Sequence, residues 1–298
     1  MYLVNANKNL LITGKLIRQA DILVKTVPEQ SDCMLSGMAL LPDKRMVLCD
    51  SENNSLKLVN LESNILVDSL HLSSRPHAVC GIPESCVAVT LPMVHKIQIF
   101  STQPNIEMTK IIETSGSCQG ITFWQDTFIV TNKKGNKRSL AVMDIDGHVS
   151  TEVVNDTQGR PLIKGPSYVS VGGLTPTLHV SDKKHSSVTK MDLQLTIRDR
   201  IALHSSARPN AMFQLDDNQL LVCSGTLSGI HDKLVLLNSE TGESRIIIDG
   251  VHGLMCAGYS EELEKLYVSC LEYELSDVRN SVLVFDSVGK KQQQCLLI

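Results

Sequence analysis

The chain has 298 residues, of which 42% are hydrophobic, and a formal net charge of −4 at pH 7. An acidic balance argues against a general polyanion binder, whose usual mark is a basic domain, although it leaves room for a local basic patch. No run approaches the roughly 20 apolar residues of a membrane helix, and the N-terminus lacks the features of a signal peptide.

The first expected element is a strand over residues 20–26, which follows an irregular segment at 1–14. Residues 36–74 then contain four short apolar runs separated by turn-forming residues. Each run is too short for a helix and has branched residues at alternate positions, so a four-stranded antiparallel meander is predicted. A meander of this size cannot bury both faces alone and needs neighbours of its own kind.

The same unit recurs along the chain. Its second strand, MVLCD, ends at Asp50, and the equivalent positions are Thr90, Asn132, Asp182, Ser224 and Cys270. Its third strand ends at a small polar residue in every copy: Asn60, Ser101, Asp144, Asp192, Asn238 and Asp286. Intervals of 40 to 50 residues between copies, with four strands in each, predict an all-β, six-bladed β-propeller of four-stranded antiparallel blades.

We expect a single domain over residues 15–298, because repeat architectures grow by adding units. The blades are expected at about 36–74, 75–116, 117–165, 166–207, 208–253 and 254–298. The strand at 20–26 is expected to pair beside residues 281–286 and close the ring, since closure removes exposed sheet edges. Residues 292–298 compete for the same position.

Nine cysteines occur without a C-x-x-C pair or a zinc-type spacing. This usage favours free thiols packed in strands, and hence a cytoplasmic protein. The C-terminal Cys295-Leu-Leu-Ile298 has the form of a prenylation box behind Lys290 and Lys291. An apolar end that completes a blade explains it equally well, and no membrane partner is expected unless Cys295 is prenylated.

Residues 37–60 (GMALLPDKRMVLCDSENNSLKLVN) resemble an NHL repeat, and residues 16–33 resemble the strand that precedes the first repeat in tripartite-motif-like NHL proteins. The resemblance covers residues 15–74, and the second-strand Asp recurs only at Asp50 and Asp182. It implies a module that binds protein or RNA, joined in full-length members to a RING finger, B-box and coiled coil. The RING cysteines and histidines are absent here, so a role in ubiquitination would be substrate recognition alone.

Basic residues are expected on one face of the ring, where second-to-third-strand connections and the starts of first strands open. The candidate partner-binding residues are Arg75, Lys133, Lys134, Lys137, Arg138, Lys183, Lys184, His185, Arg208 and Lys233. Such a cluster suits phosphates or an acidic peptide, whereas solvated loop lysines are the simpler interpretation. RNA is disfavoured because base stacking needs exposed aromatics, and Phe123 and Trp124 are expected to pack between blades.

An enzymatic alternative comes from a resemblance to gluconolactonase-like propellers, which hold a divalent metal in the channel. The residues expected at the channel mouth are Gly37, His77, Gly120, Ser167, Asn210 and His252 or Gly253. None is a carboxylate, which a hard cation requires, although His77, Asn210 and His252 suit a softer metal. We expect no cofactor and no catalytic residue, and keep a metal-dependent lactonase or esterase as the alternative. Asp50 and Asp182 are expected to cap turns or tie blades together.

Overall fold

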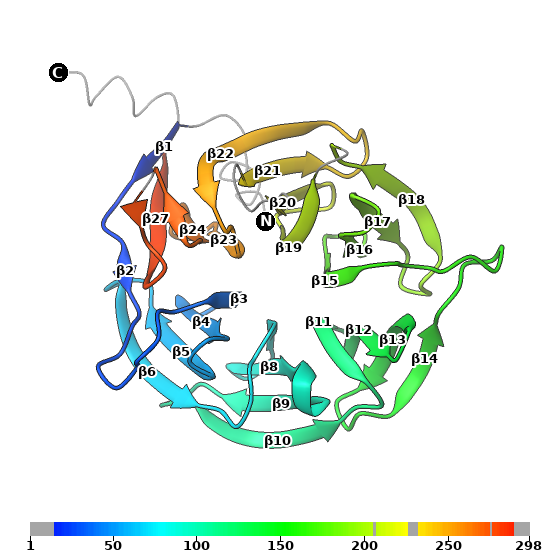
Figure 1. The fold of residues 1–298 in the computed structure, drawn as a ribbon, viewed down its shortest axis with the longest axis horizontal. Coiled ribbons are helices and arrows are strands. Elements are labelled where there is room, and N and C mark those ends of the chain that lie inside the picture. Colours follow the sequence, from blue (N-terminus) through cyan, green and yellow to red (C-terminus); the bar gives the residue numbers. More distant parts are fainter. Residues whose placement is uncertain (1–14, 205–206, 226–231, 275, 289–298) are drawn as a thin grey trace.

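The protein forms a ring of β-sheets. Its structure, a computed structural model, describes residues 15–204, 207–225, 232–274 and 276–288. The strands of this part form six antiparallel sheets around a central channel (Figure 1). The prediction of a six-bladed β-propeller with four-stranded blades is therefore confirmed.

The blades follow one another in chain order. Blade 1 contains β3 (Leu35–Leu41), β4 (Arg45–Asp50), β5 (Ser55–Asn60) and β6 (Ile65–His71). Blade 2 contains β7 (Val79–Ile82), β8 (Cys86–Leu91), the short helix η1 (Pro92–Val94), β9 (Lys96–Ser101) and β10 (Glu107–Glu113). Blade 3 contains β11 (Ser117–Trp124), β12 (Thr127–Lys134), β13 (Lys137–Asp144) and β14 (Val149–Val153).

The second half of the ring repeats this order. Blade 4 contains β15 (Pro166–Gly172), β16 (Thr177–Asp182), β17 (Ser187–Met191) and β18 (Ile197–Ala202). Blade 5 contains β19 (Arg208–Gln214), β20 (Gln219–Gly225), β21 (Asp232–Asn238) and β22 (Ser244–His252). Blade 6 contains β23 (Cys256–Ser260), β24 (Lys265–Ser269) and β27 (Ser281–Val288).

Blade 6 is completed by the beginning of the chain. β1 (Lys15–Arg18) pairs antiparallel with the end of β27, and β2 (Ile22–Leu23) pairs with Val282 and Ser281 at its start. The predicted closure by an N-terminal strand beside residues 281–286 is confirmed, with β1 as an additional partner. The competing segment 292–298 and the irregular segment 1–14 lie outside the described residues.

One insertion was not predicted. Between β24 and β27, the chain forms a small hairpin of β25 (Glu272–Tyr273) and β26 (Ser276–Asp277), which joins the sheet of blade 5 through β22. The sixth copy has the room for it, because 16 positions separate Cys270 from Asp286, against ten between Asp50 and Asn60.

Second and third strands are buried on both faces, as the patterns of β4 and β5 show, because adjacent blades cover them. The fourth strand β6 instead alternates between exposed and partly buried residues. The polar residues that end the third strands cap turns, as expected: Asn60, Asp144 and Asn238 each accept hydrogen bonds from backbone amides of the following turn. These caps fix where each fourth strand begins.

The inner strands of neighbouring blades approach at backbone distance. A Cβ atom on Gly120 would lie 2.8 Å from the carbonyl oxygen of Ser167, and one on Gly37 would lie 3.0 Å from that of His77. Glycine is therefore required at these two positions. No helix in the described ranges is long and apolar enough to cross a lipid bilayer.

Candidate functional site

The starts of the inner strands and the ends of the second strands lie on one face of the ring, which we call the upper face. The pairing shows this directly: Ser117 is opposite Lys133 in blade 3, and Arg208 is opposite Gly225 in blade 5. The connections from second to third strands open on the same face. All the sequence-predicted basic residues therefore belong to this side, but their environments differ.

The β12–β13 hairpin carries the densest positive charge. Lys134 pairs with Lys137 and Lys133 pairs with Arg138, on either side of a two-residue turn. The three lysines are exposed and Arg138 is partly exposed. None of the four makes an ion pair with a carboxylate of the described residues. This hairpin tip, which we call the basic hairpin, is available to an external anion.

Several other candidate residues already have partners. Arg75 makes a salt bridge of 2.7 Å with Glu52. His185 Nδ1 lies 2.7 Å from Asp182 Oδ2. Lys233 is partly buried within β21, opposite Ser224. These three residues are less available for a ligand than the basic hairpin.

Lys183 lies partly buried towards the channel mouth. Burial, followed by the charge of Arg208, lowers its pKa. Lys184, the next residue, is exposed, and its side chain lies against Gly165. Lys183 and Arg208 thus add positive charge near the axis of the ring, whereas Lys184 continues the charge outwards over blade 4.

The channel mouth differs from the metal site of the enzymatic alternative. The buried hydroxyl of Tyr168, in blade 4, donates a hydrogen bond to the carbonyl oxygen of Ser36, in the opposite blade 1. The His77 ring packs against the Tyr168 ring in a tilted arrangement, with 5.2 Å between ring centroids. Asn210 Oδ1 accepts a hydrogen bond from Ser167 Oγ at 3.4 Å. An apolar cluster that includes Tyr168 and the first residues of the inner strands surrounds this contact.

The placement of His252 at this mouth was wrong. His252 ends β22, the fourth strand of blade 5, and its Nδ1 lies 3.3 Å from Glu272 Oε2 in the inserted hairpin. It is displaced because β23 begins only at Cys256. The predicted trio His77, Asn210 and His252 is therefore not brought together.

The sequence alone does not single out the seam between blades 3 and 4, where a polar groove lies. The connection 154–165 turns back on itself there, with Asp156 N donating to Arg160 O at 2.8 Å and Asp156 Oδ2 accepting from Arg160 Nε at 2.9 Å. Its inner end is fixed, because Leu162 and Ile163 are buried in the core of the two blades.

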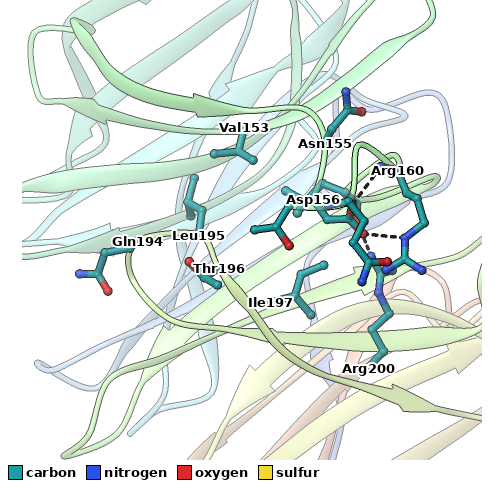
Figure 2. Close-up of a pocket in the computed structure, with 12 residues that line it drawn as sticks. Val153, Asn155, Asp156, Arg160, Gln194, Leu195, Thr196, Ile197 and Arg200 are labelled. Atoms are coloured by element: carbon teal, nitrogen blue, oxygen red, sulfur yellow. Dashed lines mark hydrogen bonds and ion pairs between the residues drawn. The ribbon is translucent and has the colours of Figure 1, made fainter.

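Two pockets flank this connection. One of about 430 Å³ is lined by residues that include Gln194, Thr196 and Arg200, and Figure 2 shows Arg160 and Arg200 on the same side of it. The second, of about 520 Å³, shares Asp156, Arg160 and Arg200 and adds Lys164, His185 and Ser187. Arg200 is held in place by a hydrogen bond of 2.8 Å to Leu162 O. We call this second pocket the seam pocket.

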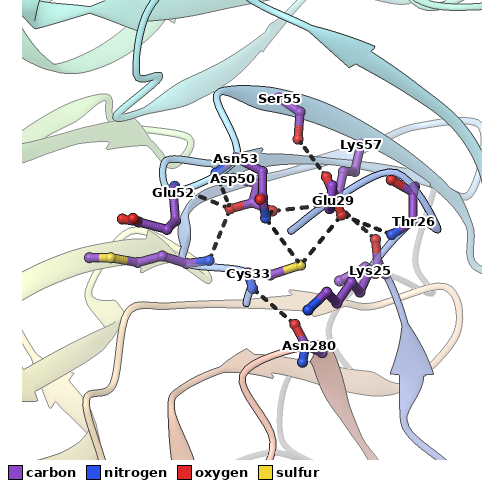
Figure 3. A network of polar contacts seen from close by, with 12 residues as sticks. Lys25, Thr26, Glu29, Cys33, Asp50, Glu52, Asn53, Ser55, Lys57 and Asn280 are labelled. Atoms are coloured by element: carbon purple, nitrogen blue, oxygen red, sulfur yellow. Dashed lines mark hydrogen bonds and ion pairs between the residues drawn. The ribbon is translucent and has the colours of Figure 1, made fainter. Parts of the chain in front are cut away.

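Two groups of side chains among the described residues have converging metal-ligand atoms. In the first, Glu29, Cys33 and Asp50 lie where the chain enters blade 1 (Figure 3). Lys57 Nζ already occupies this centre: it contacts the Glu29 oxygens at 2.6 and 2.7 Å and Asp50 Oδ2 at 3.4 Å. The ammonium group neutralises the carboxylates, so this group is a structural ion network that joins the lead-in segment to blade 1.

The second group, Asp144, Asp146 and His148, is a turn between β13 and β14. Asp144 Oδ1 accepts the amides of Asp146 and His148 at 2.9 Å, and Asp144 Oδ2 lies 3.0 Å from His148 Nδ1. Its geometry is that of a turn cap.

Asp50 and Asp182 have the structural role that the sequence predicted. Asp50 Oδ1 accepts the Met34 amide at 2.9 Å, and Asp182 accepts the amides of Lys164 and Gly165 at 2.9 Å. Each aspartate thus fastens the segment arriving from the preceding blade. Burial alone would raise the pKa of Asp50, but hydrogen bonds from Asn53 and the Met34 amide and the charge of Lys57 bring it below its ordinary value.

Comparison with known proteins identifies the fold. No protein-family model and no curated protein sequence matches the chain. Similar solved structures include a streptogramin B lyase (TM-score 0.62, 11% identity, 93% of this chain and 99% of that chain). Others are hydrazine synthase of Kuenenia stuttgartiensis (0.59, 12%, 83% and 77%) and glutaminyl cyclase of Myxococcus xanthus (0.50, 12%, 71% and 93%). At such identities the similarity shows the propeller fold alone.

The Lys57 network gives a stability prediction. Lys57→Met would leave Glu29 and Asp50 close together without their buried counter-charge, so we expect a loss of about 3 to 5 kcal/mol in the free energy of unfolding. Urea denaturation of the two proteins measures it. Adding Glu29→Gln to Lys57→Met should restore part of the loss, and a single variant as stable as the wild type would contradict the structural role.

The buried His179 and the half-buried His77 predict a pH dependence. Burial lowers the pKa of His77 and of His179 from 6.5 to about 4. Between these values the unfolded chain binds more protons than the folded one, so stability falls as the pH decreases from 6.5 to about 4. The full loss is roughly 3 kcal/mol for each histidine. His77→Phe, which keeps a ring against Tyr168, should reduce this slope in urea unfolding at a series of pH values, whereas equal slopes would contradict the assignment.

Proposed function

We propose that this chain is a non-enzymatic recognition propeller that binds an acidic segment of a protein partner across the upper face of blades 3 and 4. The observation that carries the proposal is the basic hairpin, whose Lys133, Lys134, Lys137 and Arg138 lack carboxylate partners among the described residues. Exposed like charges are unfavourable to each other when they lie close together. An acidic ligand relieves this repulsion and gains charge-assisted contacts.

Neighbouring groups extend the charge. Blade 4 follows blade 3 in the ring and presents exposed Lys184 and Lys164 on its own upper connections. The seam pocket adds Arg160 and Arg200 beside them. Basic residues therefore lie both at the hairpin and at the seam between blades 3 and 4, an arrangement that suits an extended peptide. Electrostatic complementarity of this kind sets partner choice and the association rate.

The enzymatic alternative receives less support. Tyr168 and Ser36 meet across the channel, and the His77 ring packs against the Tyr168 ring. The carboxylates that converge among the described residues are held by Lys57 or by turn amides. The names of the similar structures therefore suggest no activity for this chain, because propellers share a scaffold and differ in their sites.

RNA is the other alternative. The only Trp, Trp124, ends β11, at the face opposite to the basic hairpin. Phe123 is half-buried against the core and packs on Phe128 with 5.2 Å between centroids. The basic surface thus has no described aromatic platform from blade 3 on which bases stack, and this favours a peptide.

The narrower role rests on the NHL resemblance of residues 15–74. It extends the proposal to substrate recognition within a tripartite-motif-like ubiquitin ligase system, in which another component carries the transfer chemistry. A cytoplasmic location belongs to the same proposal, because the described cysteines are all free thiols and a reducing compartment preserves them.

Charge reversal tests the proposal. Lys133→Glu with Lys134→Glu should weaken binding of a fluorescein-labelled decaglutamate peptide by about tenfold or more, since two attractions become repulsions. Fluorescence anisotropy at low salt measures the affinity. The thermal unfolding midpoint should not change, because both side chains are exposed.

The matched control is Arg198→Glu with Lys265→Glu, which reverses the charge of two residues towards the opposite face, at the starts of β18 and β24. It changes net charge by the same amount and should retain binding. Equal losses in both double variants, or tighter binding of a decameric poly(U) RNA than of decaglutamate, would contradict an acidic-peptide site on the upper face.

A further inference from the structure

Three blades share a serine at one register position of the third strand. Ser55 is opposite Asp50 in blade 1, Ser139 is opposite Asn132 in blade 3, and Ser187 is opposite Asp182 in blade 4. All three serines are buried. Because their backbone positions are equivalent, differences in the hydrogen-bond partners of the three hydroxyls must come from the surrounding side chains.

In blades 1 and 3 the serine binds a carboxylate of the protein itself. Ser55 Oγ donates to Glu29 Oε1 at 3.2 Å, and Glu29 comes from the segment that leads into blade 1. Ser139 Oγ donates to Glu152 Oε1 at 2.5 Å, and Glu152 belongs to the fourth strand, opposite Ala141. The repeat therefore contains a carboxylate-binding position at this depth, filled from two different elements.

In blade 4 the same position is surrounded by positive charge. The residue that corresponds to Glu152 is Arg200, opposite Thr189. Ser187 is 5% exposed and its Oγ has no hydrogen-bond partner in the described part of the chain. Thr189 lies on the same face of β17 and its buried Oγ1 likewise has no such partner. Two buried donors and a guanidinium group thus lie where the other blades hold a glutamate.

The seam pocket is the cavity in front of this serine. It is lined by Ser187 and Arg200, by His185, and by Arg160 and Lys164 from the connection that arrives from blade 3. Its blade 1 counterpart is lined by Ser55 and Asn53, and there the arriving segment supplies Glu29. The two pockets correspond element by element. The segment arriving at the blade 1 pocket supplies Glu29, whereas the segment arriving at the seam pocket supplies Lys164 and an Arg160–Asp156 pair.

The charges around the seam pocket are not balanced internally. Asp156 is bound by Arg160, and the buried Asp182 is bound by His185 and backbone amides. Lys164 and Arg200 make no ion pair with a carboxylate in the described ranges. None of residues 1–14, 205–206, 226–231, 275 and 289–298 is Asp or Glu. Within the described ranges no carboxylate neutralises Lys164 or Arg200, so the pocket suits a carboxylate supplied by a ligand.

We propose that the seam pocket binds the carboxylate of an Asp or Glu side chain from an acidic peptide, at the position that Glu29 occupies in blade 1. Ser187 Oγ donates to one carboxylate oxygen, and Arg200 and Lys164 neutralise its charge. This proposal rests on the proposed function and specifies where the peptide is held. The basic hairpin attracts the acidic segment, and the seam pocket binds one carboxylate within it. Hydrogen bonds to charged groups in buried sites are the strong ones.

The test converts blade 4 to the arrangement of blade 3. Arg200→Glu places a carboxylate at the register position of Glu152, within reach of Ser187, and should weaken decaglutamate binding by about 10- to 100-fold. Its matched control, Arg198→Glu, makes the same charge change two residues away in β18, where Arg198 pairs with Asp192 at the surface. The control should change affinity by less than about threefold. Equal weakening in the two variants would overturn the seam pocket.

Ser187→Ala gives an independent measurement that does not depend on folding of the Arg200 variant. It removes a buried hydroxyl that has no described partner, so thermal stability should be retained while affinity for decaglutamate falls by about fivefold. Unchanged affinity in Ser187→Ala and in Arg200→Gln would overturn the proposal. If the Lys133 and Lys134 variant still loses binding in that case, the proposed function stands without the seam pocket.

A final competition experiment distinguishes a peptide ligand from a small free carboxylate. Free glutamate and acetate share the chemistry of the ligand, but they do not engage the basic hairpin at the same time. Decaglutamate should bind at least about 100-fold more tightly than free glutamate in competition, because linked contacts raise the effective concentration. Equal affinities would assign the pocket to a small carboxylate and contradict the peptide.

Discussion

Closure of the ring between the two ends of the described chain is the constraint on which the structure depends. β1 and β2 both pair with β27, and the segment that follows them passes into blade 1 past Lys57 and Asp50. Lys57 is completely buried, which is tolerated only because Glu29, Asp50 and Val24 O surround its ammonium group. Once this joint is made, every blade has a fixed neighbour, and the basic hairpin of blade 3 lies next to the connections of blade 4.

Repetition then explains how one blade can differ from the others in the proposed binding. Ser55, Ser139 and Ser187 occupy the same register position, and each buried hydroxyl needs a hydrogen-bond partner. In blades 1 and 3 the hydroxyl binds a glutamate of the chain itself. Blade 4 has Arg200 where blade 3 has Glu152. A single difference in charge, at an unchanged register, turns an internal contact into a pocket suited to an external carboxylate.

The fold could be predicted because its signals are local and repeated. The second strands end at regular intervals and the third strands end in turn-capping residues such as Asn60 and Asp144, so the number of blades follows from counting copies. The position of the basic hairpin followed from the same repeat. The hairpin's role in binding stays a proposal, since the structure contains no partner.

Contacts between distant blades could not be predicted from the sequence. Tyr168 reaches Ser36 across the channel over 132 positions, and no periodicity marks that pair. The His252 error arose because the length of β22 and the late start of β23 depend on the inserted hairpin. Arg200 was missed because the pairing of β17 with β18 contains an irregularity between Lys190 and Met191, so the residue opposite Thr189 does not follow from counting. The only sequence feature that pointed to the seam pocket was the long connection between the third and fourth blades, which includes residues 156–161.

Hydrogen exchange of the backbone amides, with and without decaglutamate, tests the central claim most directly. The account predicts slower exchange in the connection 154–165 and in residues 133–138 and 183–187 when the peptide is bound. Exchange in the β17–β18 and β23–β24 turns, on the opposite face, should stay the same. Protection confined to that opposite face, or none at a saturating peptide concentration, would contradict recognition through blades 3 and 4.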